Sequence, residues 1–158
     1  MKGPIRLLML SLPLLMLAPG CGSDPGKPAD AQPGTAPAPV ESKVVVPPSQ
    51  AGKWKAAKIS VQDKGSGRTF TQEVALGADA PVPGTGLTIR VDAVLPDFTM
   101  GGGVITSKSD NPANPAAQVL VTEGGQPVFK GWMFTLFPEA HPFVHPKVLI
   151  KLVALVPA

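Results

Sequence analysis

Apolar and polar residues alternate with a period of two over much of the chain beyond residue 53. This alternation is typical of strands, because successive side chains of a strand point to opposite faces of a sheet. The pair Gly124-Gly125 falls between two such stretches and favours a tight hairpin turn. The last stretch is almost wholly apolar and branched, as in a strand covered on both faces. The pattern predicts strands at 58–63, 68–76, 87–95, 119–122, 127–137 and 148–156.

These strands predict an all-β domain over residues 53–158, a small antiparallel β-sandwich or barrel of about six strands. Composition agrees with this class. The chain holds 17 glycines and 20 prolines in 158 residues, roughly a quarter of all positions against a usual level near an eighth. Such a content excludes a long helix bundle. A single cysteine excludes an internal disulfide framework and any multi-cysteine metal site.

The N-terminus has the features of an export signal. A short basic start is followed by the apolar run 7–17 and by small residues before Cys21. The run is about half of the roughly 20 residues that a membrane-spanning helix needs. Residues 1–20 resemble a bacterial lipoprotein signal peptide, in which Cys21 becomes the lipid (palmitate) attachment site. The alternative is an ordinary secretory signal cut near Ala18, with Cys21 left as a free thiol.

A lipid at Cys21 predicts a protein anchored to a membrane of the bacterial envelope and facing the periplasm. Gly22 resembles the residue that follows the lipidated cysteine in lipoproteins sorted to the outer membrane. Removing the signal takes away Lys2 and Arg6, so 14 basic side chains become 12 against 11 acidic ones. The remaining charge is nearly balanced and forms no basic stripe, and we therefore expect no nucleic-acid partner.

Residues 21–52 are rich in Pro, Ala and Gly and contain no aromatic residue. A segment of this composition buries too little apolar surface to offset its chain entropy, so the sequence predicts a disordered tether. The run Val44-Val45-Val46 offers an alternative for its last part, a short strand added to the domain.

The first irregular stretch of the domain, residues 96–116, contains Gly101, Gly102 and Gly103. Three successive glycines permit positive φ angles and close backbone approach. Their amides could form a nest for an anionic ligand, although no following helix or lysine supports a phosphate loop. A bulge or mobile flap is the structural alternative.

The second irregular stretch, residues 137–146, contains both histidines, His141 and His145, together with Glu139. These three side chains are the candidate ligands for zinc or copper. A proline follows each histidine, which opposes the helix that would bring the two imidazoles to one face. A rigid loop in which His145 bonds backbone carbonyls is the alternative, and we expect no cofactor.

Aromatic residues gather in the stretch 127–137. Trp132 and Phe134 have the same parity and are expected in the core, because aromatic rings dominate burial in a small sandwich. Phe129, Met133 and Phe137 have the opposite parity. Either the strand is covered on both faces, or an apolar patch remains for a partner. Phe129 and Phe137, together with the glycine stretch 101–103, are therefore the candidate contacts for a partner or ligand.

Two motifs carry a family resemblance. Gly131-Trp132-Met133-Phe134 is followed by His145-Pro146, and Asp63-Lys64 is followed by Gly67-Arg68-Thr69. In this order they resemble the bacterial domain-of-unknown-function family 2155, over residues 58–156. The resemblance implies no known activity. Leu95-Pro96-Asp97-Phe98, residues 111–116 and Gly131-Trp132 are similar to the extracytoplasmic part of ResB-type cytochrome c maturation proteins, which implies a role near haem delivery or redox assembly.

The sequence contains no nucleophile elbow, no catalytic triad with its usual flanks and no suggestive carboxylate pair, so we do not expect an enzyme. The expected function is that of a membrane-anchored periplasmic lipoprotein, a non-catalytic binding or envelope-assembly module with an envelope protein as partner. The alternative is a carrier of a small ligand, a metal or haem that uses the glycine stretch 101–103 and His141 with His145.

Overall fold

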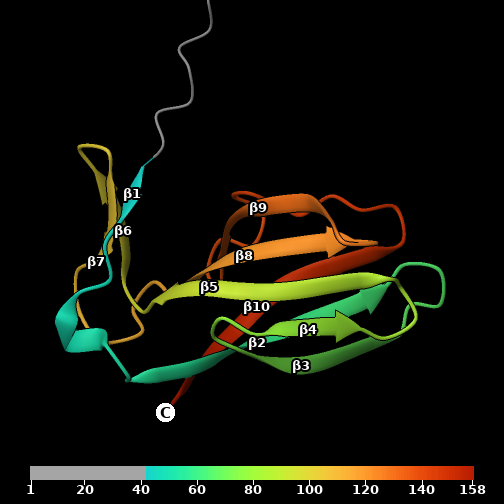
Figure 1. Ribbon diagram of the computed structural model, residues 1–158, viewed down its shortest axis with the longest axis horizontal. Helices are drawn as coiled ribbons and strands as arrows, with labels where there is room; N and C mark the ends of the chain where they lie inside the picture. The colour runs from blue at the N-terminus through green and yellow to red at the C-terminus, as the bar shows by residue number, and fades with distance from the viewer. Residues whose placement is uncertain (1–41) are drawn as a thin grey trace, which may run out of the picture. The chain divides into compact units, whose positions relative to one another are not determined.

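The strands that the alternation predicts are present, with shifted ends. The computed structural model describes residues 42–158, so the signal segment 1–20, Cys21 and residues 22–41 lie outside the described part. An all-β fold is confirmed, and residues 42–158 contain no helix that could cross a membrane. The expected strands are β2 (Trp54–Asp63), β3 (Thr69–Ala75), β5 (Leu87–Leu95), β8 (Ala116–Glu123), β9 (Gln126–Phe134) and β10 (Val148–Pro157) (Figure 1).

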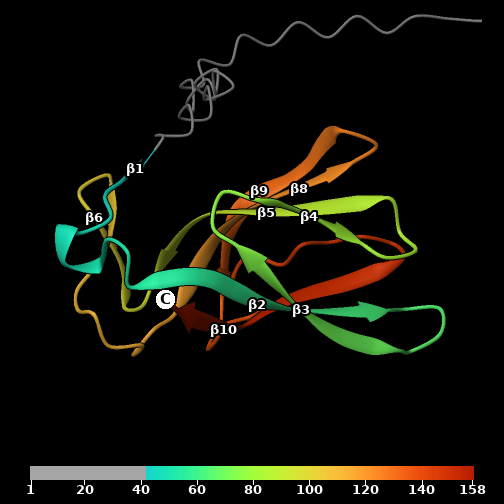
Figure 2. The same ribbon diagram turned by 60° about the horizontal axis from the view of Figure 1, so that its bottom comes forward.

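Most strands belong to two antiparallel sheets that face each other (Figure 2). One sheet has the order β10-β2-β3 and the other the order β4-β5-β8-β9. The strand β4 (Asp79–Val82) is not among the six predicted strands. It contains Pro81, which has no amide hydrogen to donate, and an edge strand tolerates this because one of its sides has no partner strand. Neither sheet closes on itself, so the domain is a sandwich and not a barrel.

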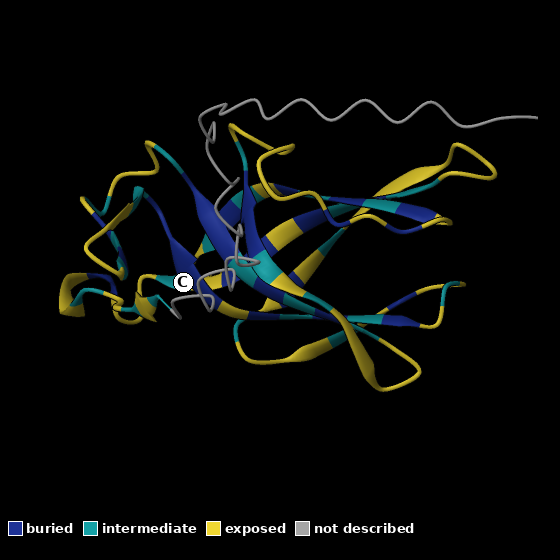
Figure 3. Cartoon of the chain, turned by 90° about the horizontal axis from the view of Figure 1, so that it is seen from above, coloured by how far each residue is buried: buried dark blue, intermediate teal, exposed yellow. Residues whose placement is uncertain are grey.

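The core fills the space between these two sheets. Its branched side chains are fully buried, and each contributes about 1.5–3 kcal/mol through the apolar surface that it removes from water. Buried positions concentrate on the strands, whereas the connecting turns are exposed (Figure 3). Its fully buried members include Ile59, Val61, Val74 and Val148 on one sheet and Leu87, Ile89, Val91, Val119 and Val121 on the other.

A third, smaller sheet lies at one end of the sandwich (Figure 1). It has the order β1-β7-β6, where β6 is Phe98–Gly101 and β7 is Val104–Ser107. The glycine stretch, expected as a bulge or flap, is the turn of the β6–β7 hairpin. Gly102 and Gly103 have φ angles of 58° and 76°, and such successive positive angles belong to the type I′ turn that glycine favours.

The strand β1 (Lys43–Val44) pairs in parallel with β7. The amides of Lys43 and Val45 donate to the carbonyls of Gly103 and Ile105, each at 2.8 Å. A 3₁₀ turn, η1 (Pro48–Gln50), follows. The tether expected over residues 21–52 is therefore folded against the domain from Ser42 onward, so the folded domain begins before the expected boundary at Lys53.

The chain from η1 into β2 is held by side chains as well as by backbone. Gln50 is buried, and its amide nitrogen donates to the Ser109 carbonyl at 3.0 Å. Lys53 and Ser49 both bind the carboxylate of Asp110. We call residues 43–53 the strap, because they fasten the N-terminal entry of the domain to the segment that contains β6 and β7.

The third sheet covers a second core that contains Trp132 and Phe134. The ring of Phe98 packs edge-on against both of them, with centroid distances of 5.2 Å and 4.9 Å. Met133 points the other way, into the core between the two large sheets. Strand β9 is therefore covered on both faces near its end, which is one of the two arrangements that the sequence left open.

We predict that Phe98→Ala lowers the free energy of unfolding by about 2–4 kcal/mol, because the substitution empties the space between Trp132 and Phe134. Equilibrium denaturation with urea measures the change. Phe137→Ala is the matched control: Phe137 is 59% exposed, and its removal is expected to cost less than about 0.5 kcal/mol. Equal effects of the two substitutions would contradict the second core.

Candidate functional site

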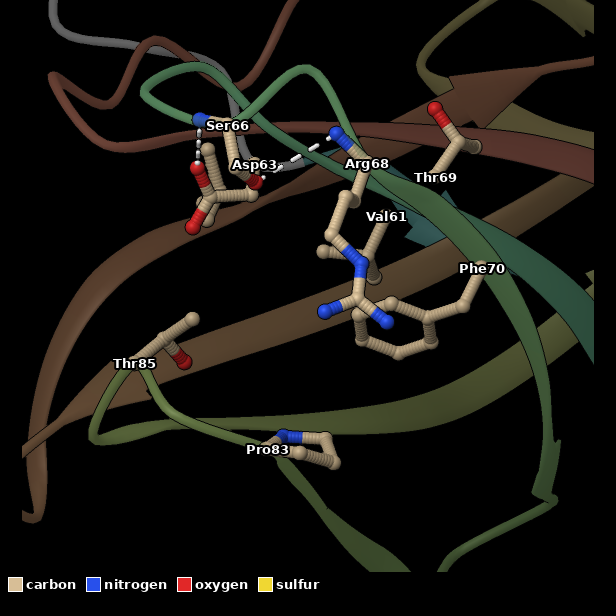
Figure 4. Close-up of a pocket in the computed structure, with 9 residues that line it drawn as sticks. Val61, Asp63, Ser66, Arg68, Thr69, Phe70, Pro83 and Thr85 are labelled. Carbon is tan, nitrogen blue, oxygen red and sulfur yellow. Dashed lines mark hydrogen bonds between the residues drawn. The ribbon is translucent and has the colours of Figure 1, made fainter.

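A cavity of about 230 Å³ lies at the end of the sandwich opposite the third sheet. It forms where the β2–β3 turn, residues 64–68, separates from the β4–β5 turn, residues 83–86 (Figure 4). Its apolar wall consists of Val61, Phe70, Pro83 and Val148. Its polar lining consists of Asp63, Ser66, Arg68, Thr69 and Thr85. We call this cavity the end pocket.

The acidic side of the end pocket is built by a tight turn. The Ser66 amide donates to Asp63 Oδ1 at 2.7 Å, and the Gly67 amide donates to the Asp63 carbonyl at 2.8 Å. Gly67 has a φ of 71°, an angle that glycine adopts without steric cost. The hydrogen bond from the Ser66 amide, and after it one from the Ser66 hydroxyl, holds the pKa of Asp63 below its ordinary value. Asp63 is therefore a carboxylate at neutral pH.

The same hairpin, β2–β3, also supplies the basic and apolar sides of the end pocket. Arg68 precedes β3, and Figure 4 shows its side chain extended along the pocket, away from the Asp63 carboxylate. Phe70 pairs with Val61 across the two strands, so both side chains lie on the inner face of the sheet. Val61 is buried, whereas Phe70 is 37% exposed at the rim. The hairpin thus supplies a cation, an anion and an aromatic wall.

The opposite wall is fixed by Thr85. Its hydroxyl donates to the Val82 carbonyl at 2.9 Å and accepts from the Leu87 amide at 3.1 Å. These two bonds hold the turn between β4 and β5 in one shape. Because both turns are held by internal hydrogen bonds, the end pocket is preformed.

The His-Pro motif lies beside this site. Lys64 Nζ donates to the His145 carbonyl at 2.7 Å, and the Lys64 amide donates to the Lys147 carbonyl at 2.8 Å. His145 is buried, and its ring stacks on Phe143 at a centroid distance of 5.6 Å. The structure therefore joins the two motifs, Asp63–Thr69 and His145-Pro146, although about eighty residues separate them.

The candidate metal ligands have separate partners. His145 Nδ1 accepts from the Lys147 amide at 3.3 Å, and its Nε2 faces a carboxylate oxygen of Glu123 at 3.7 Å. Glu139 pairs with Lys151 at 3.2 Å, and the exposed His141 lies over Phe134. Within residues 42–158, no three His, Cys, Asp or Glu side chains are grouped as metal ligands. The rigid-loop alternative expected His145 to bond backbone carbonyls, whereas its ring accepts from a backbone amide and no hydrogen bond from the ring to a carbonyl is present in residues 42–158.

The residues predicted to contact a partner or ligand lie in different parts of the domain. Phe129 is half-buried against Phe143, at a centroid distance of 5.6 Å, and packs on the main core. Phe137 is exposed in the connection between β9 and β10. Gly101, Gly102 and Gly103 are exposed at the hairpin tip of the third sheet, far from the end pocket (Figure 1). Of the two candidate phenylalanines, Phe137 is thus the exposed one.

A larger hollow of about 460 Å³ lies beside Gly131 and Trp132. It is lined by residues of the strap, of β7 and of the outer faces of β8 and β9, and Lys130 is its one charged lining residue within the described part of the chain. The end pocket is smaller but carries two opposite charges, so it offers a ligand more specific interactions.

Sequence reasoning did not identify Arg68 and Phe70 as site residues, although it singled out the segment around Asp63 as a motif. Comparison of the chain with models of protein families, with curated proteins and with solved structures finds no match. The site is therefore interpreted from its own geometry, and the two family resemblances remain predictions.

The low pKa of Asp63 predicts the sign of its effect on stability. A carboxyl group whose pKa falls on folding stabilises the protein at pH values above the pKa of the unfolded state, which is about 3.9 for aspartate. This stabilisation is lost as the pH falls through the pKa of the folded state. We predict that Asp63→Asn lowers the melting temperature at neutral pH and that the difference from the wild type shrinks below about pH 3.9.

Thermal unfolding followed by circular dichroism at several pH values measures this difference. Asp79→Asn is the control, because no hydrogen bond to the Asp79 side chain is present in residues 42–158. A pH-independent difference between Asp63→Asn and the wild type would contradict the assignment.

Proposed function

We propose that this protein is a lipid-anchored, non-catalytic binding module of the bacterial cell envelope. Cys21 is the attachment site, the segment that follows it is the tether, and the sandwich carries the binding site. The proposed location is the periplasmic face of the outer membrane.

One observation carries the proposal: the entry of the chain and the end pocket lie at opposite ends of the sandwich. The strap ends at Lys53, and β2 then runs ten residues to Asp63 at the pocket. A strand rises about 3.3 Å per residue, so roughly 30 Å separates the two ends. A domain held through its strap presents the pocket away from its attachment point, as a tethered binding module requires.

The contacts of the strap support the same function. Backbone hydrogen bonds from Lys43 and Val45, the buried Gln50 and the ion pair between Lys53 and Asp110 fix the direction in which the chain enters. The tether sets the reach of the module, and the strap sets its orientation at the tether's end.

We predict that the wild-type protein, expressed in a bacterial host with radiolabelled palmitate, carries the label and sediments with membranes. Cys21→Ser is expected to abolish labelling and to shift the protein into the soluble periplasmic fraction, because the thioether cannot form. Ser23→Ala, two residues further along, is the control and is expected to behave as the wild type. Labelled Cys21→Ser protein, or an unlabelled wild type, would overturn the proposal.

A further inference from the structure

The end pocket contains two opposite charges, Asp63 and Arg68, that form no ion pair with each other. Asp63 Oδ1 accepts from the Ser66 amide at 2.7 Å, and within residues 42–158 the Asp63 carboxylate takes part in no ion pair. Within the same range, the Arg68 guanidinium takes part in no ion pair and no side-chain hydrogen bond. Figure 4 shows the two groups on different sides of the pocket.

This arrangement selects against ligands of a single charge. An anion that binds Arg68 is repelled by Asp63, and a cation that binds Asp63 is repelled by Arg68. A ligand that carries both charges can form a favourable charge pair with Arg68 and another with Asp63. The guanidinium offers a two-pronged donor that matches a carboxylate, and the ionised Asp63 carboxylate accepts from an ammonium group.

The rest of the lining defines the body of the ligand. Val61 and Val148 form a buried apolar floor, and Phe70 and Pro83 stand at the rim. The volume, about 230 Å³, lies below the roughly 300–1,000 Å³ of sites for drug-sized molecules. The pocket therefore suits a small molecule with one apolar group next to its charges.

We propose that the end pocket binds a small zwitterion, an α-amino acid with an apolar side chain. Its carboxylate pairs with Arg68, its ammonium group with Asp63, and its side chain packs against Phe70 and the valine floor. This assignment rests on the proposed binding function and specifies its ligand class.

Isothermal titration calorimetry of the purified full chain with three probes tests this assignment. Leucine has both charges, N-acetyl-leucine lacks the ammonium group, and leucinamide lacks the carboxylate. Leucine is expected to bind at least about tenfold more tightly than either relative, because each of these loses one charge-assisted contact. Equal binding of all three, or no binding of leucine at about 10 mM, would overturn the assignment.

Arg68→Gln is expected to remove the preference for leucine over leucinamide. Its folding is checked by the melting temperature, which should not change, because no residue in 42–158 pairs with the guanidinium. Arg90→Gln is the matched control: Arg90 pairs with Asp92 on β5 at 2.7 Å, does not line the end pocket, and is expected to leave binding unchanged. A preference for leucine that survives Arg68→Gln would contradict the role of Arg68.

The apolar part of the assignment has its own pair of variants. Phe70→Ala is expected to weaken leucine binding about five- to tenfold, through lost apolar contact, whereas Phe137→Ala is expected to have no effect. Unchanged binding in Phe70→Ala would contradict the proposed orientation of the ligand. Failure of leucine to bind a protein that is labelled at Cys21 would overturn the ligand class and leave the anchored module standing.

Discussion

Strand β9 ends in three large side chains that project alternately to its two faces, and this is the constraint on which the rest of the structure depends. Met133 enters the core between the large sheets, and Trp132 and Phe134 emerge on the outer face. A two-layer sandwich alone would leave these two rings in water. The third sheet covers them, with Phe98 packed edge-on against both rings.

The covering hairpin in turn determines how the chain enters the domain. Strand β7 has an edge that accepts β1, and the segment after β7 supplies Ser109 and Asp110 to hold the residues that follow. The strap therefore enters at the end where the second core lies. The other end of the sandwich is free for the turns that build the end pocket, so the aromatic cluster of β9 and the proposed ligand site are linked through the topology.

The sequence predicted those parts of the structure whose cause is local. Alternation located six of the seven strands of the two large sheets, all except β4. Gly124-Gly125 located the β8–β9 hairpin, whose turn glycines have φ angles of 56° and 83°. For the strap, the sequence offered only the alternative of a short added strand at Val44-Val45-Val46, and β1 lies at Lys43–Val44. The disordered tether was preferred because β1 is two residues long and its partner, β7, lies about sixty residues away. The β6–β7 hairpin was missed because its three glycines permit many conformations, and the partner strand selects one.

The candidate site was predictable only in part, for the same reason. The predicted strands 58–63 and 68–76 leave a short connection between them at the motif Asp63–Thr69. The pocket also needs a second turn around Thr85 and a floor that includes Val148 from β10. Phe129 and Phe137 have the same parity in the sequence; the connection after β9 brings Phe143 onto Phe129 and leaves Phe137 exposed. Such contacts between distant segments decide exposure, and a local pattern does not contain them.

Amide hydrogen exchange of the strap tests most directly whether residues 43–53 belong to the folded domain. The Val45 amide donates to the Ile105 carbonyl at 2.8 Å, and the Lys53 amide donates to the Gln50 carbonyl at 3.1 Å. We expect the Val45 amide to exchange at least about a hundredfold more slowly than in an unstructured chain. Exchange of this amide at the unstructured rate would mean that the tether extends to residue 52 and that nothing orients the domain at its entry.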